Sequence, residues 1–247
     1  IIRDIIQVQS VRSEVIDGNF GYIRIAQFQA ETGSQFREEA KKLLSGDDKI
    51  MGVILDLRNN PGGLLGACVE IADALLDSGL IVYTEGRVPS ANGEFKASPG
   101  DLLNGLPLVV IINNGSASAS EILAGAIQDN KRGIIIGTRS FGKGSVQTVL
   151  PLRDNKAIKL TTARYYTPSG SSIQAEGIVP DIEVEPAEIK IIEQNNRFSE
   201  ANLARHLSND KAGDDSSPEA ANEKSVSSDS QLYEALNILK GIVFYND

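Results

Sequence analysis

Continuous apolar runs that stop at glycine-rich turns limit what this chain can fold into. Residues 50–57 and 106–112 are two such runs, and turns containing Gly62, Gly63 and Gly115 follow them. Apolar runs of this length are typical of strands buried on both faces, as in a parallel sheet. Helical spacing lies between them. The alternation between about residue 10 and residue 187 therefore predicts an α/β domain.

The same periodicities place the other elements. Further strands are expected at residues 20–28, 80–83, 133–137, 145–152 and 157–166, and helices at 34–44, 65–76 and 120–129. Beyond Pro186 the composition changes. Residues 189–207 are a polar helix candidate, 208–230 read as a linker, and 231–243 regain an apolar helical stripe of Leu232, Leu236 and Leu239.

Composition excludes several classes of function. The chain has 247 residues, of which 41% are hydrophobic, enough for a packed core, and a net charge of -9 argues against binding nucleic acid. Lone Cys68 lies in an apolar helical pattern and is expected in the core. With one cysteine and one histidine, His206, a Cys/His zinc site is excluded. No stretch approaches the roughly 18 apolar residues of a membrane span, and neither a metal nor an organic cofactor is expected.

Three serines alternate with alanine where a buried strand gives way to a helix. Ser118 and Glu121 match the capping box of a helix N-terminus, in which serine and glutamate satisfy unpaired backbone donors. A hydroxyl at that position would equally lie where an oxyanion is stabilised. This segment alone leaves open both the role and the choice among Ser116, Ser118 and Ser120.

Lys143 is the first candidate for a base, because His206, the only imidazole, lies in a polar stretch. A lysine base must be neutral, so we expect apolar surroundings, to which residues 134–136 (three isoleucines), Phe141 and Val146 contribute. Gln147 would share the face of Lys143 on a strand. A surface lysine in a glycine turn is the alternative. A phosphate-binding loop is disfavoured, because Gly144 follows Lys143 and a strand comes next instead of a helix.

Four motifs in order resemble the C-terminal processing peptidases, also called tail-specific proteases. The motifs are Asp56-Leu57-Arg58-Asn59-Asn60-Pro61-Gly62-Gly63, Gly115-Ser116-Ala117-Ser118-Ala119-Ser120-Glu121, Phe141-Gly142-Lys143-Gly144-Ser145-Val146-Gln147-Thr148 and Thr162-Ala163-Arg164-Tyr165-Tyr166-Thr167-Pro168-Ser169-Gly170. The resemblance implies a Clp protease/crotonase-like α/β core over residues 10–187, with a C-terminal helical extension over 188–247. It implies that Ser118 is the nucleophile and Lys143 the base, with Gln147 assisting and the N–H groups of Gly63 and Ala119 forming the oxyanion hole.

The resemblance also sets expectations outside the core. Residues 1–9 match only the strand that leaves a PDZ domain, and an export signal would lie upstream, so a periplasmic or envelope location is expected. Expected partners are protein or peptide substrates with accessible C-termini, an adaptor protein, and a second copy docked on the leucine stripe. Docking of that stripe on the chain's own core is the alternative. Two other functions stay open, a crotonase-like acyl-CoA enzyme and a non-catalytic module that binds peptide tails.

Overall fold

The computed structural model describes residues 9–46, 49–154, 156–188 and 229–246. Several predicted segments lie outside these ranges. They are residues 1–8 of the predicted PDZ strand, the polar helix candidate at 189–207, which includes His206, and the linker up to residue 228. No helix within the ranges is long and apolar enough to cross a lipid bilayer.

The main sheet has six described strands in the order β1-β2-β3-β6-β7-β10. They are Val11–Ile16 (β1), Phe20–Ile25 (β2), Gly52–Asp56 (β3), Leu108–Ile112 (β6), Ile134–Gly137 (β7) and Ile182–Glu183 (β10). β1 pairs antiparallel with β2, and all other neighbours are parallel. Parallel strands need crossovers, which helices supply: Thr32–Leu44 (α1), Leu65–Leu75 (α2) and Ala119–Asp129 (α3).

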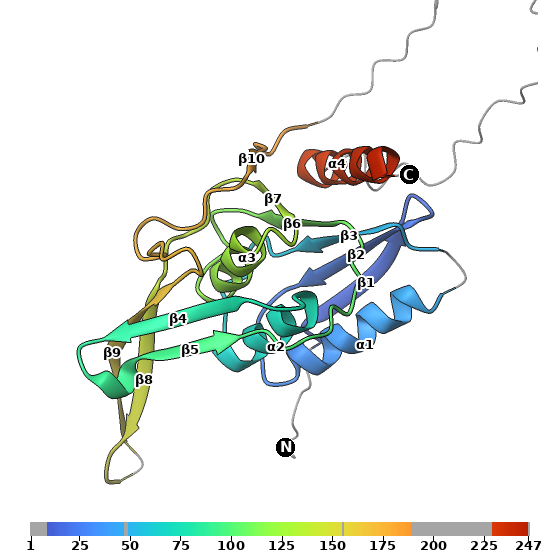
Figure 1. Cartoon of the computed structure of the whole chain (residues 1–247). Coiled ribbons are helices and arrows are strands. Elements are labelled where there is room, and N and C mark those ends of the chain that lie inside the picture. Colours follow the sequence, from blue (N-terminus) through green and yellow to red (C-terminus); the bar gives the residue numbers. More distant parts are fainter. Residues whose placement is uncertain (1–8, 47–48, 155, 189–228, 247) are drawn as a thin grey trace, which may run out of the picture.

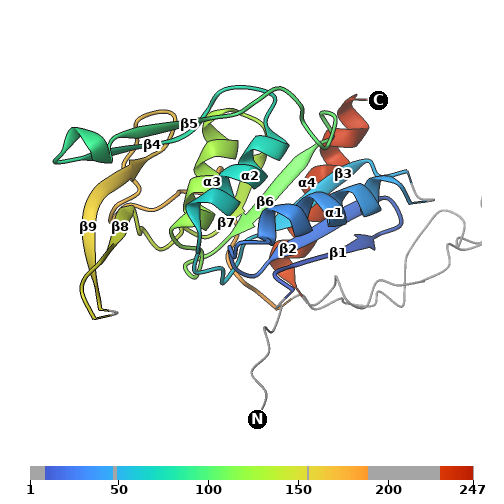
Figure 2. The ribbon, with the colours of Figure 1, turned by 90° about the horizontal axis from the view of Figure 1, so that it is seen from below.

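Helices cover both faces of this sheet. α1, α2 and α3 lie on one face, and Ser230–Asn246 (α4) lies across the other (Figure 1, Figure 2). Alternate residues of the central strand β6 serve the two cores: Val110 and Ile112 pack toward α1–α3, whereas Val109 and Ile111 pack toward α4. The continuous apolar runs in the sequence therefore reflect burial on both faces, as predicted, and an α/β core is confirmed.

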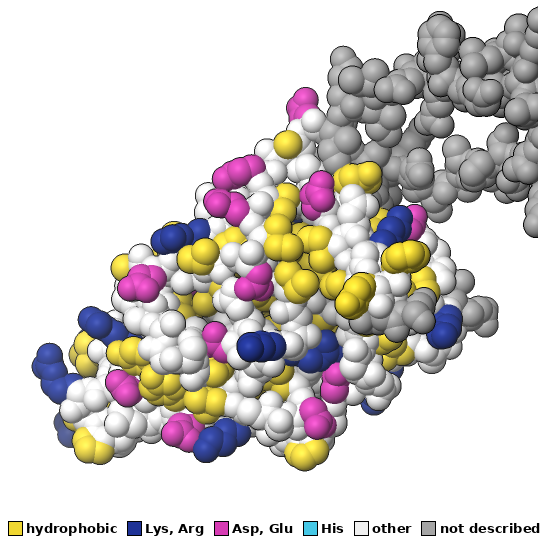
Figure 3. Space-filling model, turned by 45° about the horizontal axis from the view of Figure 1, so that its top comes forward, with side chains coloured by type: hydrophobic (Ala, Val, Ile, Leu, Met, Phe, Trp, Pro, Cys, Tyr) yellow, Lys and Arg dark blue, Asp and Glu magenta, His cyan; other side chains and the backbone are white. Residues whose placement is uncertain are grey.

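The leucine stripe of α4 has its partner within the same chain. Leu236 and Leu239 are buried against Ile54, Val109, Ile111 and Ile136, and Leu232 packs at the margin of this cluster. A β-carbon at Gly52 would lie 3.1 Å from the Leu239 side chain, so glycine there allows the close approach. The observation that suggested docking on a second copy thus has another explanation. Figure 3 shows this face, where hydrophobic side chains remain visible around α4 among charges of both signs.

A second, antiparallel sheet extends from one end of the body. Its strands follow the order β5-β4-β9-β8, with Leu80–Gly86 (β4), Gly93–Lys96 (β5), Ser145–Pro151 (β8) and Ala157–Tyr166 (β9); a short 3-10 helix, Pro89–Ala91 (η1), precedes β5. The β8–β9 hairpin projects from the body (Figure 1, Figure 2). A hollow of ≈ 620 Å³ on this sheet is lined by residues of β4, β9 and the loop after β4, and by none of the predicted site residues.

The long elements occur where the sequence predicts them. All seven strands and three helices predicted for residues 10–187 are present, within a few residues at each end. Cys68 is fully buried, and desolvation raises the pKa of its thiol, so it is a core residue as expected. The strands β1, β5 and β10 were not predicted; they lie at sheet edges, where short mixed sequences carry little periodic signal.

Candidate active site

The turns after β3 and β6 meet at one edge of the main sheet. β3 ends at Asp56 and β6 at Ile112, and because the two strands are parallel neighbours their carboxyl ends lie together. Hydrogen bonds join the turns: the Asn59 N–H donates to Asn113 Oδ1 at 2.9 Å, and the Ala117 N–H donates to the Asn60 carbonyl at 3.0 Å. The glycine turn and the serine segment therefore form one structural unit.

The three serines of this segment differ in what their hydroxyls do. Ser116 is buried and donates to the Leu57 carbonyl at 2.8 Å, and Ser120 is buried and donates to the Asn60 carbonyl at 2.9 Å. Ser118 is half-buried and caps α3 with a backbone φ of 56°. A positive φ is unfavourable for serine, by of order 1–3 kcal/mol, and persists only where the surroundings impose it. The structure thus singles out one hydroxyl.

Two backbone N–H groups beside Ser118 are unpaired. Within the described residues, neither the Gly63 N–H nor the Ala119 N–H donates a hydrogen bond to the backbone or to a side chain. The Gly62-Gly63 turn packs directly on the serine, since a β-carbon at Gly62 would lie 2.8 Å from Ser118 Cβ and 2.9 Å from the Ala119 nitrogen. Ala119 opens α3, where helical N–H groups lack intrahelical acceptors. This arrangement can bind an oxyanion.

Glu121 joins the serine to the lysine loop. Its fully buried carboxyl group accepts hydrogen bonds from the N–H of Ser118 (2.7 Å), from Ser140 Oγ (2.6 Å), and from the N–H groups of Gly142 (2.6 Å) and Lys143 (2.8 Å). The predicted capping box is present, and Glu121 also holds a loop 22 residues away. This second role could not be predicted from the sequence, because a capping motif gives no information about distant donors.

The side chains of Lys143 and Gln147 are exposed. Phe141, expected to shield the lysine, is itself 67% exposed, and no hydrogen bond joins Ser118 Oγ to Lys143 Nζ. The apolar burial predicted for Lys143 is therefore wrong for this structure. The reason is local: Ile135 and Ile136 pack into the two cores of the main sheet and are therefore not available to cover the amine. The strand predicted after the glycine loop is present as β8.

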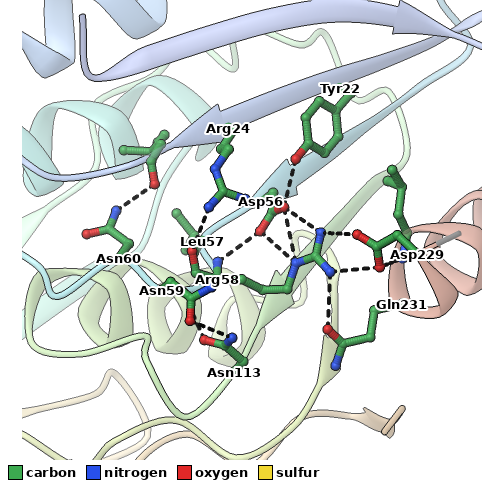
Figure 4. Close-up of polar contacts among 12 residues, drawn as sticks. Tyr22, Arg24, Asp56, Leu57, Arg58, Asn59, Asn60, Asn113, Asp229 and Gln231 are labelled. Carbon is green, nitrogen blue, oxygen red and sulfur yellow. Dashed lines mark hydrogen bonds and ion pairs between the residues drawn. The ribbon is translucent and has the colours of Figure 1, made fainter. Parts of the chain in front are cut away.

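A charged cluster lies beneath the glycine turn. The fully buried Asp56 accepts hydrogen bonds from Tyr22, Arg24 and Arg58, and the Arg58 guanidinium reaches on to Asp229 at the start of α4 (Figure 4). Burial and the nearby Asp56 carboxylate raise the pKa of Tyr22 to about 12, which keeps its hydroxyl a donor. The sequence motif contains Asp56 and Arg58, but nothing in it indicates Asp229, which is 171 residues from Arg58.

Comparison with known proteins assigns the class. The family description of peptidase family S41 matches residues 19–184, which include both turns, the serine segment and the lysine loop. The chain therefore belongs to peptidase family S41, and the resemblance found in its motifs is confirmed.

The relatives are processing proteases. The chain is 47% identical over 245 residues to a carboxy-terminal-processing protease of Bartonella bacilliformis, covering 98% of this chain and 56% of that protein. It is 41% identical to a carboxyl-terminal-processing protease of Synechocystis, covering 78% of this chain and 45% of the relative. A solved photosystem II D1 C-terminal processing protease matches with a TM-score of 0.65 and 35% identity, over 73% of this chain and 49% of that one. The chain thus spans about half the length of these proteins.

Proposed function

We propose that this chain is the catalytic core of a serine endopeptidase that processes or degrades proteins from near their C-termini. Ser118 Oγ attacks the scissile carbonyl carbon while the Lys143 amine takes its proton. Lys143 then gives that proton to the leaving amine, which leaves an ester on Ser118. Water attacks the ester, its proton passes through Lys143, and Ser118 is restored. The oxyanion of each tetrahedral intermediate is bound by the N–H groups of Gly63 and Ala119.

One observation carries this proposal. Of the three serines, only Ser118 has a hydroxyl that is not bonded to a backbone carbonyl, and it lies beside two unpaired N–H groups at the N-terminus of α3. Ser116 and Ser120 are buried and already donate. A strained, half-exposed serine next to two free donors is the arrangement that acyl transfer requires.

Lys143 must lose water and charge to act as a base. Its backbone is already held by Glu121, so the α-carbon is fixed while the exposed side chain can still turn. We propose that a bound peptide covers the amine and excludes water from it, and that Gln147, four residues along the chain, accepts a hydrogen bond from it. Catalytic contacts are often long before substrate binds and shorten in the complex.

The substrate and location follow from the relatives. We propose protein substrates with accessible C-termini, because the relatives bear the name of carboxyl-terminal-processing proteases. Bacterial and chloroplastic proteins both occur among them. We propose the bacterial cell envelope as the location, since the greatest identity among these relatives is to the Bartonella protein. An adaptor protein would be sought by crosslinking in cells.

Labelling with a serine-reactive fluorophosphonate tests the function. We expect one adduct per chain, mapped by mass spectrometry to Ser118, and hydrolysis of unstructured protein substrates. Ser118→Ala should remove both. A peptide-binding module would bind tails without labelling, and an acyl-CoA enzyme would turn over a thioester; either result would contradict the proposal.

A further inference from the structure

The residue before α4, Asp229, is hydrogen-bonded to Arg58, which directly precedes the Asn59–Gly63 turn. The Arg58 guanidinium makes a bidentate contact with the Asp229 carboxylate, from Nη1 to Oδ1 at 2.8 Å and from Nη2 to Oδ2 at 2.7 Å. Gln231 adds an acceptor for Nη1 at 3.2 Å. Figure 4 shows Asp229 and Gln231 reaching from α4 toward Arg58. Paired, bidentate contacts of this kind fix orientation as well as supplying energy.

Asp229 is itself held in place from the side of α4. Its Oδ1 accepts a hydrogen bond of 3.1 Å from the Leu232 N–H, so it caps the helix. Burial would raise the pKa of Asp229, but hydrogen bonds from Arg58 and from the first turn of α4 outweigh it, and the pKa is lowered. Gln231 Nε2 donates to the Val184 carbonyl at 2.7 Å, next to β10. Asp229 and Gln231 are thus held in place by contacts other than those with Arg58.

On its other side, Arg58 is bonded to the end of β3. Its backbone N–H and Nε both donate to Asp56 Oδ1, at 2.9 and 3.0 Å, and Nη2 contacts Oδ2 at 2.7 Å. Only 12% of the Arg58 side chain is exposed. A cation this buried needs all of its partners, and a lost carboxylate leaves it free to adopt other orientations.

The turn that follows Arg58 carries Gly63, whose N–H is one of the two proposed oxyanion donors. Asn59 and Asn60 bond to Asn113 and to the Ile25 carbonyl, and Gly62 packs on Ser118. These contacts define where the Gly63 N–H lies relative to the serine. An error of about 1 Å in such a position can cost on the order of a hundredfold in rate.

We infer that Asp229 is a positioning residue for the hydrolytic site, which it supports from α4 by holding the Arg58 side chain against Asp56 and so fixing the Asn59–Gly63 turn. This inference rests on the proposed function. Asp229 therefore supports the site from the start of α4, although this helix lies on the face of the sheet opposite α2 and α3.

Asp229→Asn in the full chain is the variant that tests this role. Asparagine is as good a helix cap as aspartate and keeps the shape, so the main loss is the ion pair with Arg58. We expect kcat and the rate of phosphonate labelling to fall by about tenfold, with KM changed less than twofold, because a displaced oxyanion donor acts in the transition state. Hydrogen exchange of a peptide covering residues 57–64 should become faster.

Ser230→Ala and Leu239→Ala are the matched controls. Ser230 lies beside Asp229 and bonds the Ala187 N–H at 2.8 Å, and Leu239 packs further along α4; neither hydrogen-bonds Arg58. Both should lower the melting temperature with kcat per folded molecule unchanged. The inference is overturned if Asp229→Asn keeps its kcat and its exchange rate, or if the controls lose kcat in proportion to stability. If the phosphonate does not label the wild type, the proposed function is refuted. Hydrogen exchange of residues 57–64 would still show whether Asp229 holds Arg58 and the turn.

Discussion

The carboxyl group of Glu121 accepts a hydrogen bond of 2.8 Å from the backbone N–H of Lys143. The same group accepts one of 2.7 Å from the N–H of Ser118. Two segments that are 25 residues apart, each carrying one partner of the proposed catalytic pair, are therefore held by a single buried side chain. The spacing of their backbones is set before any substrate binds.

Glu121→Gln should disrupt this spacing. An amide cannot accept hydrogen bonds through its nitrogen. Some of the four groups that now donate to the Glu121 carboxyl group would therefore lose their acceptor. We expect a loss of about 3 kcal/mol in unfolding free energy, measured by urea denaturation, and at least a tenfold fall in kcat. Glu38→Gln, at an exposed position of α1, is the control. Wild-type stability in Glu121→Gln would contradict the bridging role.

The serine series separates the nucleophile from its neighbours. Ser118→Ala should abolish hydrolysis at a cost of only about 1 kcal/mol, since it removes at most a cap. Ser116→Ala and Ser120→Ala should keep their activity per folded molecule, yet lose about 1–3 kcal/mol, because the Leu57 and Asn60 carbonyls lose a buried donor. Peptide hydrolysis and thermal melts check both quantities. Equal loss of hydrolysis in all three variants would contradict the assignment of Ser118 as the nucleophile.

Much of the fold could be predicted because buried strands and helices have a periodic pattern of apolar residues. β3 and β6 are buried at every position, since each lies between the two cores of the sheet, and α1–α3 all contribute apolar residues to one of these cores. The four-residue β5 and two-residue β10 show no such pattern. For α4 the apolar stripe could be predicted but its partner could not, because a stripe of leucines fits any apolar surface.

The candidate site could be predicted only in part. The motif order identified the serine segment and the lysine loop, but the choice among three alternating serines depended on hydroxyl partners, Leu57 and Asn60, that lie about 60 residues earlier in the chain. The exposure of Lys143 was predicted wrongly, because nearby isoleucines in the sequence point into the cores and not toward the loop. Contacts such as that of Arg58 with Asp229 have no local signature.

Lys143→Arg should be as inactive as Lys143→Ala. Arginine keeps the positive charge and much of the length, but a guanidinium cannot be deprotonated in a protein and so cannot accept the serine proton. The measurement is the peptide hydrolysis rate of the wild type beside both variants. Substantial hydrolysis by Lys143→Arg would rule out the base role.

Acid should release the contact between Asp229 and Arg58. Because the pKa of Asp229 is lowered in the folded chain, its ion pair stabilises the fold fully above the unfolded-state value of 3.8, and this contribution is lost as the pH falls through the lowered pKa. The melting temperature of the wild type should therefore exceed that of Asp229→Asn near pH 6, and the difference should close below about pH 3.8. A difference that does not change with pH would mean that the charge of Asp229 does not contribute.

Leu239→Ala distinguishes docking of α4 on its own chain from docking on a second copy. Leu239 is fully buried against the main sheet, so its truncation should cost about 2–5 kcal/mol and lower the melting temperature without changing the mass per particle in light scattering. Phe244→Ala, at a position that is 87% exposed, should change neither quantity. If Leu239→Ala instead lowered the particle mass while the melting temperature stayed constant, the stripe would hold subunits together, and the intrachain core formed by α4 would not describe the protein in solution.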